Sequence, residues 1–187
     1  LESSMHRALE REQFELYYQP QVAADTGELR GVEALIRWHH PEMGNIPPGK
    51  FIPRAEKSTL INHLTDYALD ASLAQLVRWR EAGIEVGVAV NVSAGDLVDP
   101  EFSARVKSLL EKHGVPGHLL ELEITEGSLI FDSNQSINEL TSLSGANIAI
   151  AIDDFGTGYS SLSRLNELPI STLKIDRSFI RSMLLSE

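Results

Sequence analysis

From Leu60 to the end of the chain, stretches with helical periodicity alternate strictly with short apolar strands. Such alternation is typical of parallel strands joined by right-handed crossover connections. The predicted strands cover Val86–Val92, Leu119–Thr125, Asn147–Asp153 and Thr172–Asp176. The predicted helices cover Leu60–Ala82, a segment capped by Asp99 that begins at Pro100 and ends at Gly114, Ser133–Ser144, Ser160–Asn166 and a stretch from Arg177 onward.

The first part of the chain departs from this alternation. A short helix over Leu1–Gln13 precedes two predicted strands, Phe14–Val22 and Leu29–Trp38. Too few residues separate these strands for a helical crossover, so we expect them to pair antiparallel as a hairpin. The Pro- and Gly-rich segment His39–Phe51 is predicted to be a loop, with its two histidines on the surface.

The strand that ends in Asp153 and Asp154 shows how side chains are divided between two faces. Alternation places Asp153 on the same face as Ala149 and Ala151, while the isoleucines at 148, 150 and 152 point toward covering helices. A carboxylate on the small-residue face at the end of a strand indicates a ligand or a catalytic group.

Other strands carry polar side chains at the equivalent place, and this decides between a barrel and an open sheet. Asn91, Glu123 and Lys174 each lie near the C-terminal end of a different strand. An open sheet would display these side chains in a row, whereas a barrel brings the strand ends to one point, where barrel enzymes carry their chemistry. The sequence therefore predicts a (β/α) barrel with an antiparallel first strand pair.

Composition limits the classes of function. The chain has 187 residues, no cysteine, and 27 acidic against 16 basic residues, which gives a formal net charge of −11. This charge and the absence of a basic block disfavour binding of polymeric nucleic acid. No apolar run approaches the length of a membrane span, so we expect no direct membrane insertion. The absence of cysteine favours a cytoplasmic location. The module could also belong to a membrane-anchored parent protein.

Five short motifs follow one another in order. They are Glu33-Ala34-Leu35-Ile36-Arg37, Asn91-Val92-Ser93, Glu121-Leu122-Glu123-Ile124-Thr125-Glu126, Asp153-Asp154-Phe155-Gly156-Thr157-Gly158-Tyr159 and Leu173-Lys174-Ile175-Asp176, accompanied by Tyr18-Gln19-Pro20 and Phe51-Ile52-Pro53-Arg54-Ala55-Glu56. Together they resemble the EAL-domain family of cyclic di-GMP phosphodiesterases over nearly the whole chain. The resemblance implies a modified TIM barrel and metal-dependent hydrolysis of cyclic di-GMP to linear pGpG.

The same resemblance implies roles for individual residues. The metal ligands of a two-metal site would be Glu33, Asn91, Glu123, Asp153 and Asp154. The catalytic groups would be Glu33, Asp153, Lys174 and Glu126, and Glu126 would support the loop from Asp154 to Tyr159. The substrate contacts would come from Gln19, Leu35, Arg37 and Asp154. Hard oxygen ligands suit Mg²⁺ or Mn²⁺. An arginine such as Arg37 is well suited to a phosphate.

Simpler interpretations stay open for three of these side chains. Glu33 and Arg37 share one face of their strand and would also fit an interior ion pair, and Lys174 would also fit a structural partner of Asp153. Glu121 shares the face of Glu123, and we expect a buried ion pair for it.

The length of the chain bears on activity. A complete barrel of this class needs about 250 residues, whereas this sequence ends at Glu187, just after its sixth predicted strand. We therefore expect a single EAL domain over residues 1–187, truncated at its C-terminus, with an unpaired edge at the last strand. The alternative function is a module that binds cyclic di-GMP or a protein partner as a sensor without hydrolysis. By resemblance, we also expect a homodimer and a preceding sensory or GGDEF-type domain.

Overall fold

The computed structural model describes residues 2–130, 134–156 and 168–184. The strands in these ranges are β1 (Phe14–Val22), β2 (Leu29–His40), β3 (Gly44–Ile46), β4 (Gly87–Val92), β5 (Leu120–Thr125), β6 (Ala149–Phe155) and β7 (Thr172–Ile175). The helices are α1 (Glu2–Glu10), α2 (Pro48–Ala55), α3 (Leu60–Glu81), α4 (Ala94–Leu97), α5 (Phe102–His113), α6 (Asn134–Gly145) and α8 (Arg177–Leu184), with short 3-10 helices η1 (Gly117–Leu119) and η2 (Glu126–Ile130). The predicted helix Ser160–Asn166 lies outside the described residues.

The seven described strands form one mixed sheet in the order β1-β2-β4-β5-β6-β7, with β3 paired to β2. β1 and β2 are antiparallel, with Phe14 opposite Trp38 and Gln19 opposite Glu33. From β2 through β4, β5 and β6 to β7, every neighbouring pair is parallel. The predicted hairpin and the predicted parallel strands are both confirmed.

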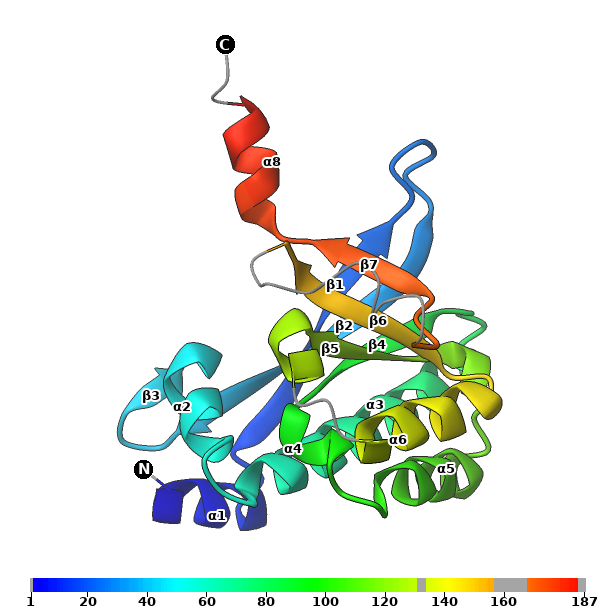
Figure 1. The fold of residues 1–187 in the computed structure, drawn as a ribbon. Coiled ribbons are helices and arrows are strands. Elements are labelled where there is room, and N and C mark those ends of the chain that lie inside the picture. The colour runs from blue at the N-terminus through cyan, green and yellow to red at the C-terminus, as the bar shows by residue number, and fades with distance from the viewer. Residues whose placement is uncertain (1, 131–133, 157–167, 185–187) are drawn as a thin grey trace.

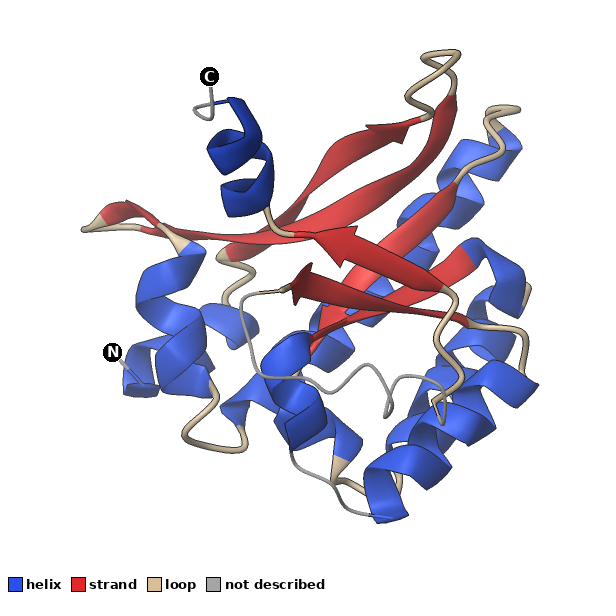
Figure 2. Ribbon diagram, turned by 45° about the horizontal axis from the view of Figure 1, so that its top comes forward, coloured by secondary structure: helices blue, strands red, loops and turns tan. Residues whose placement is uncertain are grey.

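The sheet is curved, and α3, α5 and α6 lie against one of its faces (Figures 1 and 2). The curvature brings β7 back toward β2, as the distance of 3.0 Å between Lys174 Nζ on β7 and Glu33 Oε2 on β2 shows. Within the described ranges, β1 and β7 each pair on one side only and form the edges of the sheet. This is the predicted modified barrel, open between β7 and β1. Helix α8 leaves the end of β7 and extends away from the sheet (Figure 1).

The main core lies between the sheet and the covering helices. Each strand contributes its outward-facing apolar side chains, and each helix its apolar stripe. On β6, Ile150 and Ile152 are fully buried, as the alternation predicts. A second apolar cluster at the other end of the hairpin packs α1 and α2 against Phe14 and Trp38, whose ring centroids lie 5.4 Å apart.

The prediction of a loop over His39–Phe51 is wrong in part. β2 continues to His40 and pairs with β3, so that Trp38 lies opposite Ile46. Helix α2 then starts at Pro48, in the first helical position, where a proline needs no hydrogen bond. Ile46 and Phe51 are buried in the second cluster, and this tertiary packing outweighs the turn-forming composition of the segment.

Helix α5 begins later than predicted. Its first residue is Phe102, and Asp99 is not its cap. The carboxylate of Asp99 instead accepts a hydrogen bond from the backbone N–H of Glu101 at 3.0 Å, which forms a turn before the helix. The short helix α4 was not predicted, although its N-terminus carries a capping box formed by Ser93 and Asp96.

Candidate active site

Five strands deliver polar side chains to the face of the sheet opposite the helices. Glu33 comes from β2, Asn91 from β4, Glu123 from β5, Asp153 from β6 and Lys174 from β7. Asn91 and Glu123 are direct neighbours in the register of β4 and β5. The residues on either side of each group point into the core or lie on the outer face, so the period of two along a strand fixes the direction of each side chain.

These side chains converge on the ammonium group of Lys174. Its Nζ lies 2.6 Å from Glu123 Oε2, 3.0 Å from Glu33 Oε2 and 3.8 Å from Asp153 Oδ1. Asn91 joins the group because its Nδ2 donates a hydrogen bond to Glu33 Oε1 at 3.0 Å. We call Glu33, Asn91, Glu123, Asp153 and Lys174 the acidic cluster. The structure therefore brings together four of the five predicted metal ligands and the predicted catalytic lysine.

Burial and mutual repulsion set the electrostatics of the acidic cluster. The side chain of Glu123 is fully inaccessible to solvent. Burial raises the pKa of Glu123 to about 7; Lys174 opposes this rise, and the charges of Glu33 and Asp153 add to it. Burial alone would lower the pKa of Lys174, but its hydrogen bonds and attraction to Glu123 and Glu33 raise that pKa above its usual value. Lys174 is thus a charged ammonium that holds several acidic groups together.

The donor atoms suit a hard divalent cation, because carboxylate and amide oxygens are the ligands that Mg²⁺ and Mn²⁺ prefer. In the described part of the chain, no three acidic or histidine side chains are spaced as a preformed metal cage. The oxygens of Glu33 and Glu123 are directed at Lys174 instead. A divalent ion held by Glu33 and Glu123 would share these carboxylates with Lys174.

The turn after β6 is fixed by a hydrogen bond between its backbone and Glu126. This glutamate is almost completely buried, and its Oε2 accepts a hydrogen bond from the backbone N–H of Gly156 at 2.8 Å. Asp154, near the end of β6, is exposed and has a left-handed backbone with φ of 53°. Partial burial is the main cause of a raised pKa of Asp154, and the negative charges of Asp153 and Asp176 add to it. The predicted loop extends to Tyr159, and its part from residue 157 lies outside the described residues.

Three of the four predicted substrate contacts lie along the inner face of the hairpin, and the fourth, Asp154, lies on β6. Gln19 is exposed opposite Glu33, and Leu35 is half-buried one rung further along. Arg37 places its guanidinium carbon 5.4 Å from the centre of the Tyr17 ring and donates to the carbonyl of Ile36 at 3.0 Å. Because Glu33 is bound by Lys174 and Asn91, the alternative ion pair between Glu33 and Arg37 does not form.

Sequence reasoning missed some polar contacts on this face. Gln21 points its Nε2 toward Glu123 Oε1 at 3.5 Å, and alternation from Gln19 would have placed it on this face. The ion pair expected for Glu121 is wrong: its Oε2 accepts a hydrogen bond from the hydroxyl of Thr172 at 2.8 Å. Thr172 lies one rung below Lys174, so the two contacts run in parallel between β5 and β7.

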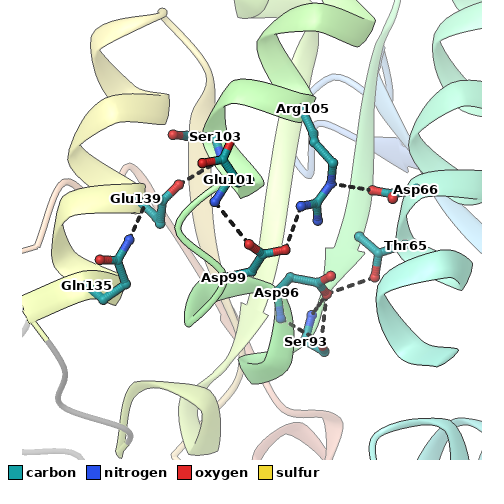
Figure 3. A network of polar contacts seen from close by, with 10 residues as sticks. All are labelled: Thr65, Asp66, Ser93, Asp96, Asp99, Glu101, Ser103, Arg105, Gln135 and Glu139. Carbon is teal, nitrogen blue, oxygen red and sulfur yellow. Dashed lines mark hydrogen bonds and ion pairs between the residues drawn. The ribbon is translucent and has the colours of Figure 1, made fainter. Parts of the chain in front are cut away.

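A second polar network fixes the end of β4 from the outer side (Figure 3). Asp96 is fully buried, and its Oδ2 accepts hydrogen bonds from Thr65 Oγ1 at 2.8 Å, Ser93 Oγ at 2.6 Å and Ser93 N at 3.0 Å. Burial raises the pKa of this carboxyl group. Ser93 follows Asn91 by two residues, so the network anchors the strand end that carries Asn91 to α3.

A cleft of about 380 Å³ lies between β2, β4, α2 and α3, and it shares Asn91 with the acidic cluster. Its walls are mainly apolar, and Arg37, Asn91, Ser93 and Thr125 add polar groups. A partly apolar cleft with a few polar groups beside a cluster of ionisable residues is typical of a small-molecule site.

A curved, mostly parallel sheet with covering helices, and with acidic groups gathered at the C-terminal ends of its strands, defines an α/β barrel protein whose site lies at the strand ends. The chain belongs to the EAL domain family, whose model matches residues 2–187.

Two curated relatives come from Pseudomonas aeruginosa. The bifunctional diguanylate cyclase/cyclic di-GMP phosphodiesterase MucR is 44% identical over 181 residues, which are 96% of this chain and 26% of the relative. The cyclic di-GMP phosphodiesterase PA2567 is 40% identical over 182 residues, which are 97% of this chain and 31% of the relative. The chain thus spans about a quarter to a third of the length of these relatives.

Solved structures agree with this assignment. The MucR phosphodiesterase in complex with cyclic di-GMP superposes with a TM-score of 0.92 at 42% identity, covering 99% of this chain and 75% of that one. The EAL enzyme Bd1971, bound to cyclic AMP and cyclic di-GMP, gives a TM-score of 0.91 at 32% identity, covering 99% of this chain and 51% of that one.

In the described residues, no helix is long and apolar enough to cross a membrane.

Proposed function

We propose that this chain hydrolyses one phosphodiester bond of cyclic di-GMP and releases linear pGpG. The observation that supports this most strongly is the acidic cluster, in which groups from five strands meet around one point. Membership of the EAL family and the names of its relatives, which are cyclic di-GMP phosphodiesterases, agree with this substrate.

EAL phosphodiesterases are metal-dependent as a class. We propose that Glu33, Asn91, Glu123 and Asp153 hold one divalent ion, that Asp153 and Asp154 face a second, and that the ions are Mg²⁺ or Mn²⁺. Ions bound there would neutralise charge on the phosphodiester and lower the pKa of a water molecule. The chemistry of the oxygen donors supports this proposal. Because Lys174 contacts Glu33 and Glu123, a metal ion and the lysine would share these carboxylates.

The remaining residues have roles that follow from their positions. Lys174 carries a positive charge beside the carboxylates, where it orients the attacking water and offsets negative charge that develops on the phosphate. Gln19 lies opposite Glu33 on the hairpin face and Arg37 lies two rungs further along β2, where both would contact substrate oxygens. Leu35, between Glu33 and Arg37 on that face, offers an apolar contact. Glu126 acts indirectly, since it holds the backbone of the turn that follows Asp153.

Product analysis tests the proposal. The chain is incubated with cyclic di-GMP and either Mg²⁺ or Mn²⁺, and the nucleotides are separated by chromatography. We expect pGpG from the wild type and none from an Asp153→Asn variant. Glu121→Gln is the matched control, because Glu121 lies on the same face of β5 but bonds to Thr172 outside the acidic cluster. Absence of pGpG with both metals would refute hydrolysis by this chain.

The second candidate function is binding of cyclic di-GMP, or of a protein partner, without hydrolysis. The contact of Lys174 with the would-be metal ligands favours this candidate, because it leaves the described residues without a preformed metal cage. Titration of cyclic di-GMP in the same assay separates the two functions, since tight binding without product indicates a sensor.

We further propose that residues 1–187 act as one domain of a longer signalling protein in the cytoplasm, beside a sensory or GGDEF-type domain, and that the domain pairs with a second copy. The greater length of the relatives supports a multidomain parent, as does the double name of MucR. Mass measurement of the purified domain by light scattering tests the pairing.

A further inference from the structure

The C-terminal end of β4, which carries Asn91, pairs with a neighbouring strand on one side only within the described ranges. The parallel ladder between β2 and β4 ends where Ala34 lies opposite Val90. On the other side, β5 continues to pair with Asn91 and Val92. Toward β2, the Asn91 side chain donates a hydrogen bond from Nδ2 to Glu33 Oε1 at 3.0 Å. The direction of this side chain therefore depends on what fixes the backbone just after the strand.

A hydrogen-bond network between α3 and α4 fixes that backbone (Figure 3). Ser93, the first residue after β4, donates its backbone N–H and its hydroxyl to Asp96 Oδ2, at 3.0 and 2.6 Å. The backbone N–H of Asp96 in turn donates to Ser93 Oγ at 3.2 Å, which completes the capping box of α4. The hydroxyl of Thr65 on α3 donates to the same Oδ2 at 2.8 Å. Asp96 thus ties the end of β4 to α3.

Burial makes this connection a strong constraint. Asp96 is completely inaccessible to solvent, and Thr65 is 4% exposed. Water cannot replace a hydrogen bond that is broken at such a place, so a donor left without its acceptor costs free energy. The support itself is rigid, because α3 contributes Leu64 to one apolar cluster and Leu69 to the other.

The donors of Thr65 and Ser93 all meet one oxygen of Asp96. The second oxygen, Oδ1, is buried and has no hydrogen-bond partner among the described residues. An asparagine at this position would keep every one of these contacts if its amide oxygen took the place of Oδ2. The network therefore needs an acceptor at residue 96 and does not need a negative charge.

We propose that Asp96 is a positioning residue for Asn91. Through Ser93 and the end of β4, it holds the Asn91 amide against Glu33, where the amide oxygen joins in binding a divalent ion. The proposal rests on the proposed function, because it takes Asn91 and Glu33 as ligands of that ion. It extends the site to a residue that lies outside the five sequence motifs.

Titration of the metal-free chain with Mn²⁺ tests the proposal without turnover, with the free ion measured by electron paramagnetic resonance. We expect Asp96→Ala to weaken Mn²⁺ binding by about tenfold, as the loss of groups that support metal ligands does. Asp96→Asn keeps the acceptor and should bind Mn²⁺ as the wild type does. Thr65→Val removes one of the donors and should cause a smaller loss, whereas Thr65→Ser keeps the hydroxyl and should retain binding.

Glu139→Ala is the matched control, because Glu139 is also a buried carboxylate that accepts a backbone hydrogen bond next to the start of a helix. It is 5% exposed and accepts from the N–H of Ser103 at 2.7 Å and from Gln135 Nε2 at 2.8 Å, within the helical layer (Figure 3). Glu139→Ala and Asp96→Ala should both lower the unfolding temperature. Mn²⁺ binding should remain unchanged in Glu139→Ala alone.

NMR of the metal-free protein gives a second readout. The side-chain amide signal of Asn91, identified by its absence in Asn91→Asp, should move in Asp96→Ala and stay in place in Glu139→Ala. An unmoved signal or wild-type Mn²⁺ affinity in Asp96→Ala, or an equal loss of affinity in Glu139→Ala, would overturn the positioning role. Wild-type Mn²⁺ binding without formation of pGpG would contradict the phosphodiesterase alone. No Mn²⁺ binding by the wild type would refute the metal site and the role of Asp96 together.

Discussion

The ammonium of Lys174 on β7 lies 3.0 Å from the carboxylate of Glu33 on β2, although β4, β5 and β6 lie between these strands in the sheet. Neighbouring strands are about 4.8 Å apart, so four steps across a flat sheet would separate β2 and β7 by about 19 Å. The two side chains together cannot span that distance and still meet Glu123. The contact therefore measures how far the sheet has curled toward a barrel.

Replacing Lys174 by methionine should reduce hydrolysis of cyclic di-GMP by at least about a hundredfold, because the charge beside the phosphate and the water is lost. The same change leaves the inaccessible Glu123 without its cation, and we expect a loss of about 3 kcal/mol in the free energy of unfolding at pH 8. Product formation and urea denaturation provide the two measurements.

Lys107→Met is a control for this variant. Lys107 also makes one short hydrogen bond, to Ser142 Oγ at 2.7 Å, but it lies on the helical layer. Activity of Lys107→Met should equal that of the wild type. If Lys174→Met keeps wild-type turnover, Lys174 has only a structural role.

Glu126 is predicted to control turnover through the backbone of Gly156. Glu126→Ala removes the acceptor for the Gly156 N–H and should lower kcat by about ten- to a hundredfold, because a small displacement of Asp153 disturbs the site. Glu126→Gln keeps a carbonyl acceptor and should lose much less. Steady-state kinetics of the two variants checks this, and equal losses in both would show that the hydrogen bond to Gly156 is not what matters.

Alternation along strands was sufficient to predict which side chains face the site. Ile150 and Ile152 lie in the core while Asp153 lies on the opposite face, because the period of two is imposed by backbone geometry. The short elements β3, α2 and α4 could not be predicted in the same way. They form because Ile46, Phe51 and Leu97 are buried by distant parts of the chain, and the local sequence does not report such packing.

The partners within the site were also harder to predict than its members. The simpler interpretation of Lys174 as a partner of Asp153 agrees with their distance of 3.8 Å, but the shortest contact of Lys174, at 2.6 Å, is to Glu123 and was not predicted. The difference depends on the curvature of the sheet and on the stagger of β7 against β6, where the register shifts between Ile152 and Phe155. Neither quantity is encoded in the spacing of residues along one strand.

Asp96 should make stability depend on pH. Burial raises its pKa in the folded state above its value of about 3.9 in unfolded chains. The folded protein then binds this proton more tightly, so the contribution of Asp96 to stability is complete below the unfolded pKa and is lost as pH rises through the folded pKa. We expect Asp96→Asn, which carries no charge at any pH, to lose less stability than the wild type between pH 4 and neutrality. Urea denaturation across this range measures the difference, and parallel curves for both proteins would contradict the prediction.

The exposed side of β7 should promote self-association. Leu173 is 46% and Ile175 is 63% exposed, and the strand pairs only with β6 within the described ranges. An apolar strand at a sheet edge offers unpaired backbone groups to a second molecule, and charged residues on such strands oppose this pairing. Ile175→Lys should therefore shift the protein toward the monomer at high concentration, as measured by size-exclusion chromatography with light scattering. Ile84→Lys is the control, because Ile84 is 45% exposed but lies in the connection between α3 and β4. If both variants associate as strongly as the wild type, the edge of β7 is not the contact surface.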